Sequence, residues 1–181
     1  IFTYSIIYFV KIESNKDAFY CGMIDGVQFN EDTMNSLPDV FAKYMKENNY
    51  KGYISSDRTF FQVFYATFVD EVKLDGLFEK GRFDVFITRE AAFKNYASNG
   101  TIIDLSTILS EEQLKRLDSK LVYITIDGSD NPIPYGILLD NARYDFCDGA
   151  GDAIDPPILS IPGNSKRKEA AKQFVDFITN K

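Results

Sequence analysis

Three groups of polar side chains each stand at the end of a short apolar run. The groups are Asp25 in FYCGMID, Ser55, Ser56 and Asp57 at the end of YKGYISSD, and Thr88, Arg89 and Glu90 at the end of FDVFITRE. Hydroxyl groups both donate and accept hydrogen bonds, and an arginine holds a carboxylate through paired N–H donors. The residue types therefore predict a binding site for a small polar solute.

The same residues also have simpler interpretations, which stay open at this point. Ser56 and Asp57 are good caps for a following helix, and Arg89 and Glu90 are typical of a helix surface that faces water. A hydrolase would need two carboxylates across a cleft, such as Asp25 with Asp57, and no pattern in the sequence indicates that pairing.

Composition excludes several other classes of site. The sequence contains no His, which removes the commonest general base and the commonest zinc ligand. Aspartates 145, 148, 152 and 155 are oxygen ligands of the kind that calcium prefers, but their spacing does not match the EF-hand loop. We expect no cofactor, no metal and no enzymatic activity.

Size and charge limit the partners. The 181 residues are enough for one well-packed domain, and 45% of them are hydrophobic, with 16 Phe and 11 Tyr. The formal net charge of −7 repels phosphate backbones, so nucleic acid is not expected as a partner.

The elements that must position the polar groups alternate along the chain. Strands are expected at 19–25, 50–55 and 83–88, and their apolar periodicity predicts helices at 36–45, 57–72 and 89–98. This order predicts a three-layer α/β domain with a parallel sheet. Ligands bind beyond the carboxyl ends of such strands, which is where the three polar groups stand.

The second half of the chain has a different pattern. Ser110 to Gln113 form a capping box, and the runs KLVYITI and PIPYGILL are joined by the turn formers DGSDN, which predicts a small β-hairpin insertion. Residues 140–157 lack periodicity and are expected to form a long surface loop. The stripe from Ala170 to Ile178 predicts a closing amphipathic helix.

Residues 1–12 and the two cysteines leave alternatives open. The apolar run IFTYSIIYFVK, which ends in Lys11, is interpreted either as the remnant of a membrane anchor or as a first strand, and residues 13–181 as a single domain. Cys21 and Cys147 are far apart in sequence; we expect two free thiols, with a disulfide as the alternative.

Three stretches in this order resemble the extracellular solute-binding proteins of ABC transporters, which have the type II periplasmic-binding-protein fold. The first is FDVFITREAAFKNYASNGTIIDLSTIL, a strand and helix followed by a glycine turn and DLS. The second is DGSDNPIPYGILLDN, with a DG…YG signature, and the third is ILSIPGNSKRKEAAKQFVDFI. The segment between DLS and ILSI is too short for a full second lobe, so the resemblance is to one lobe with a much reduced second lobe.

The resemblance implies an exported monomer, extracellular and tethered to the membrane at its N-terminus, that binds a small solute and delivers it to a membrane permease. It also adds Tyr135, from the YG signature, to the candidate ligand-binding residues. The alternative is a degenerate member of the fold that serves as a protein-interaction or structural module at the cell surface.

Overall fold

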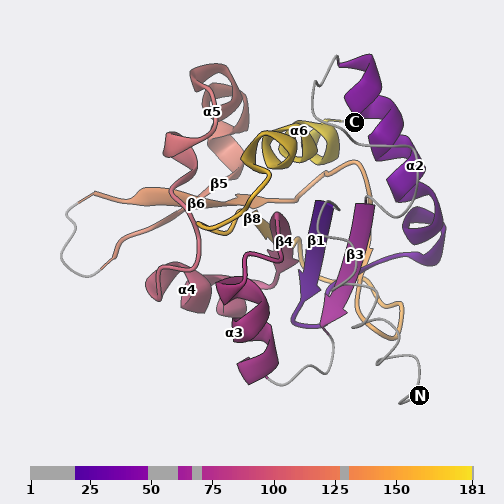
Figure 1. The fold of residues 1–181 in the computed structure, drawn as a ribbon, viewed down its shortest axis with the longest axis horizontal. Helices are drawn as coiled ribbons and strands as arrows, with labels where there is room; N and C mark the ends of the chain where they lie inside the picture. The colour runs from indigo at the N-terminus through magenta and orange to yellow at the C-terminus, as the bar shows by residue number, and fades with distance from the viewer. Residues whose placement is uncertain (1–18, 49–60, 67–70, 127–130, 181) are drawn as a thin grey trace.

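A six-stranded sheet forms the centre of the molecule (Figure 1). The computed structural model describes residues 19–48, 61–66, 71–126 and 131–180. In spatial order the strands are β3 (Phe61–Ala66), β1 (Phe19–Ile24), β4 (Val85–Thr88), β8 (Ile158–Ser160), β6 (Ile133–Leu138) and β5 (Leu121–Ile124). Helices cover both faces, so the predicted α/β class is confirmed.

The sheet is mixed, and the prediction of a parallel sheet is wrong for half of it. Strands β3, β1 and β4 run parallel, whereas β8 is antiparallel to both β4 and β6, and β5 is antiparallel to β6. The physical reason is the connection: no helix lies between β6 and β8, and a chain that returns through a loop alone pairs antiparallel.

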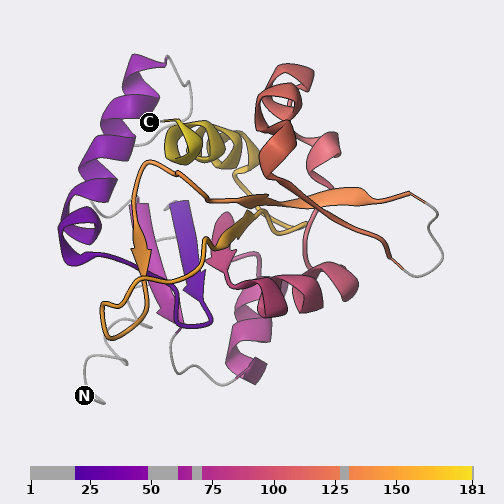
Figure 2. The ribbon, with the colours of Figure 1, turned by 180° about the vertical axis from the view of Figure 1, so that it is seen from behind.

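Two apolar layers sandwich the sheet (Figures 1 and 2). Helices α2 (Glu31–Glu47), α5 (Glu111–Leu117) and α6 (Lys168–Thr179) cover one face, and α3 (Glu71–Glu79) and α4 (Glu90–Ser98) cover the other. The first layer is built on aromatic rings: Phe41 and Phe174 lie 5.3 Å apart between ring centroids, and each is 5.5 Å from Phe19. Such ring pairs add to the free energy of burial and fix α2 and α6 over β1.

The local signals for three helices are confirmed. The capping box of α5 forms as predicted, with the Gln113 N–H donating to Ser110 Oγ and the Ser110 N–H donating to Gln113 Oε1. Helix α4 ends at the predicted glycine, since Gly100 has φ of 77°. The predicted stripe of α6 is buried from Ala170 to Ile178.

Two of the expected helices differ from the structure. Helix α2 begins at Glu31 rather than Ser36, because Asn30 Oδ1 accepts the Thr33 N–H at 2.8 Å and caps the helix earlier. Residues 61–66 form β3 and not a helix; their aromatic side chains recur at helical spacing but also favour strands, and pairing with β1 decides for the strand.

The predicted hairpin of β5 and β6 is confirmed, but it is part of the main sheet and not an insertion, because β6 pairs with β8. Residues 1–18 and the strand expected at 50–55 lie outside the described residues.

Both cysteines are free: Cys21 is buried in β1, and Cys147 is half-buried in β7 (Phe146–Cys147). No helix among the described residues is long and apolar enough to cross a membrane.

A buried carboxylate fastens the amino ends of β1 and β4. Asp84, 1% exposed, accepts the Tyr20 N–H at 3.0 Å and the Ser165 hydroxyl at 3.2 Å, and Arg167 Nη1 lies 3.4 Å from its Oδ2. In return the Asp84 N–H donates to the Tyr20 carbonyl at 2.9 Å. These bonds tie the loop before α6 to both strands and hold the strands in register.

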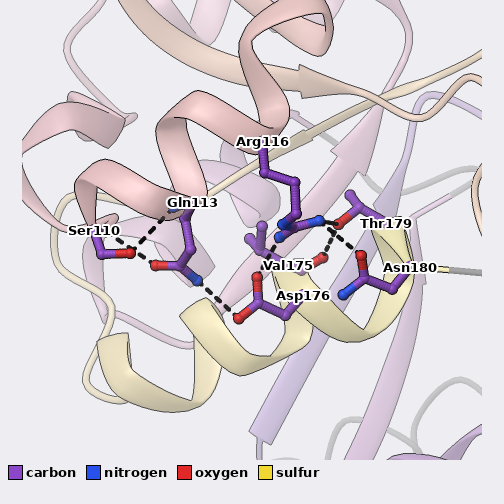
Figure 3. A network of polar contacts seen from close by, with 7 residues as sticks. All are labelled: Ser110, Gln113, Arg116, Val175, Asp176, Thr179 and Asn180. Atoms are coloured by element: carbon purple, nitrogen blue, oxygen red, sulfur yellow. Dashed lines mark hydrogen bonds and ion pairs between the residues drawn. The ribbon is translucent and has the colours of Figure 1, made fainter.

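A polar network joins α5 to the end of α6 (Figure 3). Asp176 accepts hydrogen bonds from Gln113 Nε2 and from Arg116 Nη2. Arg116 Nη1 also donates to Thr179 Oγ1 at 3.1 Å and to Asn180 Oδ1 at 2.9 Å. Since α6 has no basic residue in its own last turn, the charge of Arg116 supplies the cation that the helix terminus favours.

Candidate functional site

The carboxyl ends of β1 and β4 meet where the chain changes direction across the sheet. After β1 the chain continues to α2, which covers one face of the sheet, and after β4 it continues to α4, which covers the other face. Loops that leave two adjacent parallel strands on opposite sides diverge, and ligands of open α/β sheets bind at that position. Asp25 follows β1 here, and Thr88 ends β4.

The turn after β1 is held in an unusual backbone conformation. Asp25 has φ of 59° and Gly26 has φ of 74°, and the Val27 N–H donates to the Ile24 carbonyl at 3.2 Å. Two successive residues with positive φ form a type I′ turn, for which Asp-Gly is a favoured pair. The turn directs the Asp25 carbonyl toward β4.

Arg89 bridges the two strand ends. Its Nε donates to the Asp25 carbonyl oxygen at 3.2 Å, and its side chain is otherwise exposed. Among the described residues, no acceptor is hydrogen-bonded to the two terminal nitrogens of the guanidinium. One edge of the guanidinium is thus anchored, and the terminal N–H groups remain as donors for an anion.

The N-terminus of α4 adds a second source of positive potential. Arg89 occupies the N-cap position, and no side chain caps the helix. The first-turn N–H groups of a helix lack intrahelical partners and attract anions. Glu90 pairs with Lys94 at 2.6 Å, along the helix.

Thr88 lies in the interior, directly before Arg89. It is fully buried at the end of β4, directly opposite Ile158 of β8, and its Oγ1 has no hydrogen-bond partner among the described residues. A buried hydroxyl without a partner costs about 1 to 3 kcal/mol. Ser160 Oγ in β8 is also buried without a hydrogen-bond partner among the described residues, so this state is not particular to the carboxyl edge.

The loop 140–157 lies beside this edge (Figure 2). Its β7 pairs antiparallel with β2 (Gln28–Phe29), which directly follows the Asp25–Gly26 turn. The N–H groups of Ala150 and Asp152, and further away the charge of Arg89, hold the pKa of Asp148 below its usual range. Asp148 is thus an ordinary turn residue that stands in the field of Arg89, and the loop borders the site.

Not all candidate residues come together. Asp25, Thr88, Arg89 and Glu90 lie at one edge, whereas Ser55, Ser56 and Asp57 lie outside the described residues. Tyr135 is in the first half of β6, two strands away from β4, and is only 8% exposed. Burial, and then the charge of Asp104, raises the pKa of Tyr135, which is a core residue and not part of this edge.

Sequence reasoning missed two features of the edge. The contact of Arg89 with a backbone carbonyl leaves no trace in the sequence, because any residue at position 25 supplies that oxygen. The missing cap was detectable: the pattern TRE offers Arg at the cap position, where Ser, Thr, Asp or Asn is usual.

Two cavities described in the structure lie elsewhere. One of about 540 Å³ is bordered by the ends of α3 and α4, with Phe78, Asn99 and Asn164 in its wall. The other, of about 400 Å³, lies around the network of Arg116 and Asp176. In the first, Asn164 Nδ2 donates to the Phe78 carbonyl at 2.6 Å, near the end of α3. In the second, Gln113 and Arg116 both donate to Asp176.

Comparison with protein-family models, with curated proteins and with solved structures finds no match. Among the described residues, no three Cys, Asp or Glu side chains are grouped as a metal site would need. The function is therefore inferred from the geometry of the carboxyl edge and from the order of the sequence motifs.

Proposed function

We propose that this chain is an extracellular module resembling the solute-binding proteins of ABC transporters, and that it binds a small polar solute with an anionic group at the carboxyl edge of β1 and β4. The observation that carries the proposal is Arg89, whose Nε is anchored on the Asp25 carbonyl at 3.2 Å while its terminal nitrogens have no hydrogen-bond acceptor among the described residues. Delivery of the solute to a membrane permease is part of the same proposal.

Two kinds of donor support an anionic group at this edge. They are the guanidinium of Arg89 and the uncapped N–H groups of α4, whereas the Thr88 hydroxyl is fully buried and out of reach of a solute. A planar carboxylate matches this set, because its two oxygens accept from a guanidinium edge in parallel.

The surroundings favour a small solute with low charge. Asp148 stands in the field of Arg89, and the chain as a whole carries a net charge of −7. A polyanion would meet repulsion from both, which agrees with the expectation that nucleic acid is not a partner.

One observation favours the alternative, a degenerate fold that serves as a protein-interaction or structural module at the cell surface. The loop 140–157 occupies the part of the sequence in which a second lobe would be expected, and β7 is fastened to β2 beside the edge. A site bordered by one loop encloses a solute less than two lobes do. Solute binding itself distinguishes the two functions.

The test is a thermal-shift and native mass spectrometry screen of small carboxylates, oxyanions and neutral sugars. We expect a carboxylate or an oxyanion to stabilise the chain by about 2.7 kcal/mol at 100-fold excess over the dissociation constant. Arg89→Ala should abolish that stabilisation. Lys94→Ala, which removes the same charge from α4 but lies one turn from the edge, should retain it.

Two results would contradict the proposal. If no solute stabilises the wild-type chain, the receptor function is wrong and the interaction module is favoured. If a solute binds and Arg89→Ala binds it equally well, the solute lies elsewhere.

A further inference from the structure

Strand β5 forms one edge of the sheet and carries no charge. Its hydrogen-bonded neighbour is β6, and no strand of the described residues lies on its other side. From Leu121 to Ile126 the sequence is LVYITI, with no charged residue, no Pro and no Gly. Six-residue segments of this composition pair readily with other strands when they are exposed.

Both faces of β5 are apolar. Val122, Ile124 and Ile126 pack beside the cluster under α3 and α4, and Leu121 packs beside the cluster under α6. Tyr123 is 46% exposed and is one of two exposed large hydrophobic residues in the described chain; the other is Val40 on α2. Figures 1 and 2 show the hairpin of β5 and β6 extending beyond the helices on one side of the molecule.

The usual protection of an edge strand is nearly absent here. Natural edges carry Lys or Pro, point charges inward, contain bulges or are covered by other elements. Between Leu121 and Ile126 the one such device is an irregularity of register at Val122 and Tyr123. Lys120 stands just before the strand, but its Nζ donates to the Asp140 carbonyl at 2.7 Å and is directed toward the loop.

We propose that β5 pairs antiparallel with β5 of a second copy of this chain, across a twofold axis. Three observations favour a second copy. The strands β8, β6 and β5 already alternate in direction, so an antiparallel partner continues the sheet. The segment is neutral in a chain of net charge −7, so two copies meet here without direct repulsion between like charges. An isologous pair satisfies the outer backbone groups of both strands and closes at two copies, which avoids fibres.

The pairing surface is one strand wide, which is typical of weak and reversible interfaces. We therefore expect a dimer that forms with rising concentration, and not an obligate one. A dimer differs from the monomer that the sequence resemblance implies, and it does not depend on the solute site, because β5 lies at the far end of the sheet from β1.

Sedimentation equilibrium over a wide range of protein concentrations tests the inference. The wild-type mass should rise from 20.6 kDa toward twice that value. Tyr123→Lys, which places like charges close together across the axis, should remain monomeric. Val40→Lys is the matched control, because it makes the same kind of change at the other exposed apolar residue, and it should dimerise as the wild type does.

Hydrogen exchange of the wild-type chain gives a second readout that needs no variant. Amides of residues 121–126 should gain protection as the concentration rises, while those of α2 should not. A wild-type mass of 20.6 kDa at every concentration overturns the inference. So does a folded Tyr123→Lys chain that dimerises like the wild type, or a mass that grows beyond two copies.

Discussion

Replacing Asp84 should change both the stability of the chain and its dependence on pH. The carboxylate is 1% exposed and accepts the Tyr20 N–H at 3.0 Å and the Ser165 hydroxyl at 3.2 Å. Asp84→Ala removes the carboxylate that accepts both of these hydrogen bonds. Asp84→Asn keeps one oxygen for that N–H but cannot ionise.

The expected magnitude follows from these contacts. The loss of a hydrogen bond to a charged group costs about 1.5 to 3 kcal/mol. Arg167 loses its ion pair with Asp84 in addition. Because the Arg167 side chain is 23% exposed, water compensates for part of that loss. We expect Asp84→Ala to lower the free energy of unfolding by roughly 2 to 4 kcal/mol, a large part of the 5 to 15 kcal/mol typical of a domain.

The effect of pH has a definite sign. Burial raises the pKa of Asp84 above the ordinary 3.8, against the opposing effects of the Tyr20 N–H, Arg167 and Ser165. The folded chain therefore holds more protons than the unfolded chain between the two pKa values. The contribution of this group to the free energy of unfolding is present below pH 3.8 and is lost as the pH rises through the folded-state pKa.

Urea unfolding followed by circular dichroism, at a series of pH values from acid to neutral, measures these differences. Relative to the wild type, Asp84→Asn should become more stable as the pH rises, because Asn does not take up the cost of a buried charge. Parallel pH profiles for the wild type and Asp84→Asn would refute the reasoning, as would an Asp84→Ala variant with unchanged stability.

Three further predictions follow from other contacts. Gly136→Ala should destabilise the chain by about 1 to 3 kcal/mol in the same urea assay, because its Cβ would overlap Ile158 Cγ2 and would lie 2.7 Å from Phe93 Cε2. The double variant with Ile158→Ala should lose less stability than the sum of the two single variants. Strict additivity would show that Gly136 does not pack against Ile158. Arg116→Ala removes the ion pair with Asp176 and should lower the free energy of unfolding by about 1 kcal/mol, because the Arg116 side chain is 34% exposed. Hydrogen exchange at the end of α6 should become faster in Arg116→Ala. Lys115→Ala should change neither property. In thiol titration of the native chain, Cys147 should react slowly, and Cys21 should not react until the chain unfolds. Burial raises the pKa of both thiols, and Cys21 is in addition fully buried. Equal reaction rates for the two thiols would contradict the position of β1 in the core.

Local signals in the sequence predicted the elements that depend on neighbouring residues. The capping box of Ser110 and Gln113, the glycine that ends α4 and the stripe of α6 each act within a few residues, and each is confirmed. The turn at Asp25 and Gly26 also forms locally, since Asp-Gly is a favoured pair for a type I′ turn. The pair alone does not decide the conformation, because Asp75-Gly76 lies inside α3.

Features that depend on distant residues were not predictable. The direction of β8 is set by pairing with β4 and β6, and the strand at 61–66 by pairing with β1. At the candidate site, the sequence placed Thr88 and Arg89 at a strand end correctly, because a strand followed by a helix fixes them locally. It could not show that Arg89 reaches across to the Asp25 carbonyl, or that Tyr135 lies two strands away.

The most direct test of an anion site at the carboxyl edge of β1 and β4 is backbone amide NMR of the labelled wild-type chain during titration with a carboxylate found in the screen. The site predicts saturable shifts concentrated at the N–H groups of residues 88–92 and at the Asp25–Gly26 turn, with the side-chain Nε–H of Arg89 moving in parallel. Saturable shifts concentrated instead at residues 78–79, 99–101 and 163–164, around the 540 Å³ cavity, or no saturable shift at all, would contradict it.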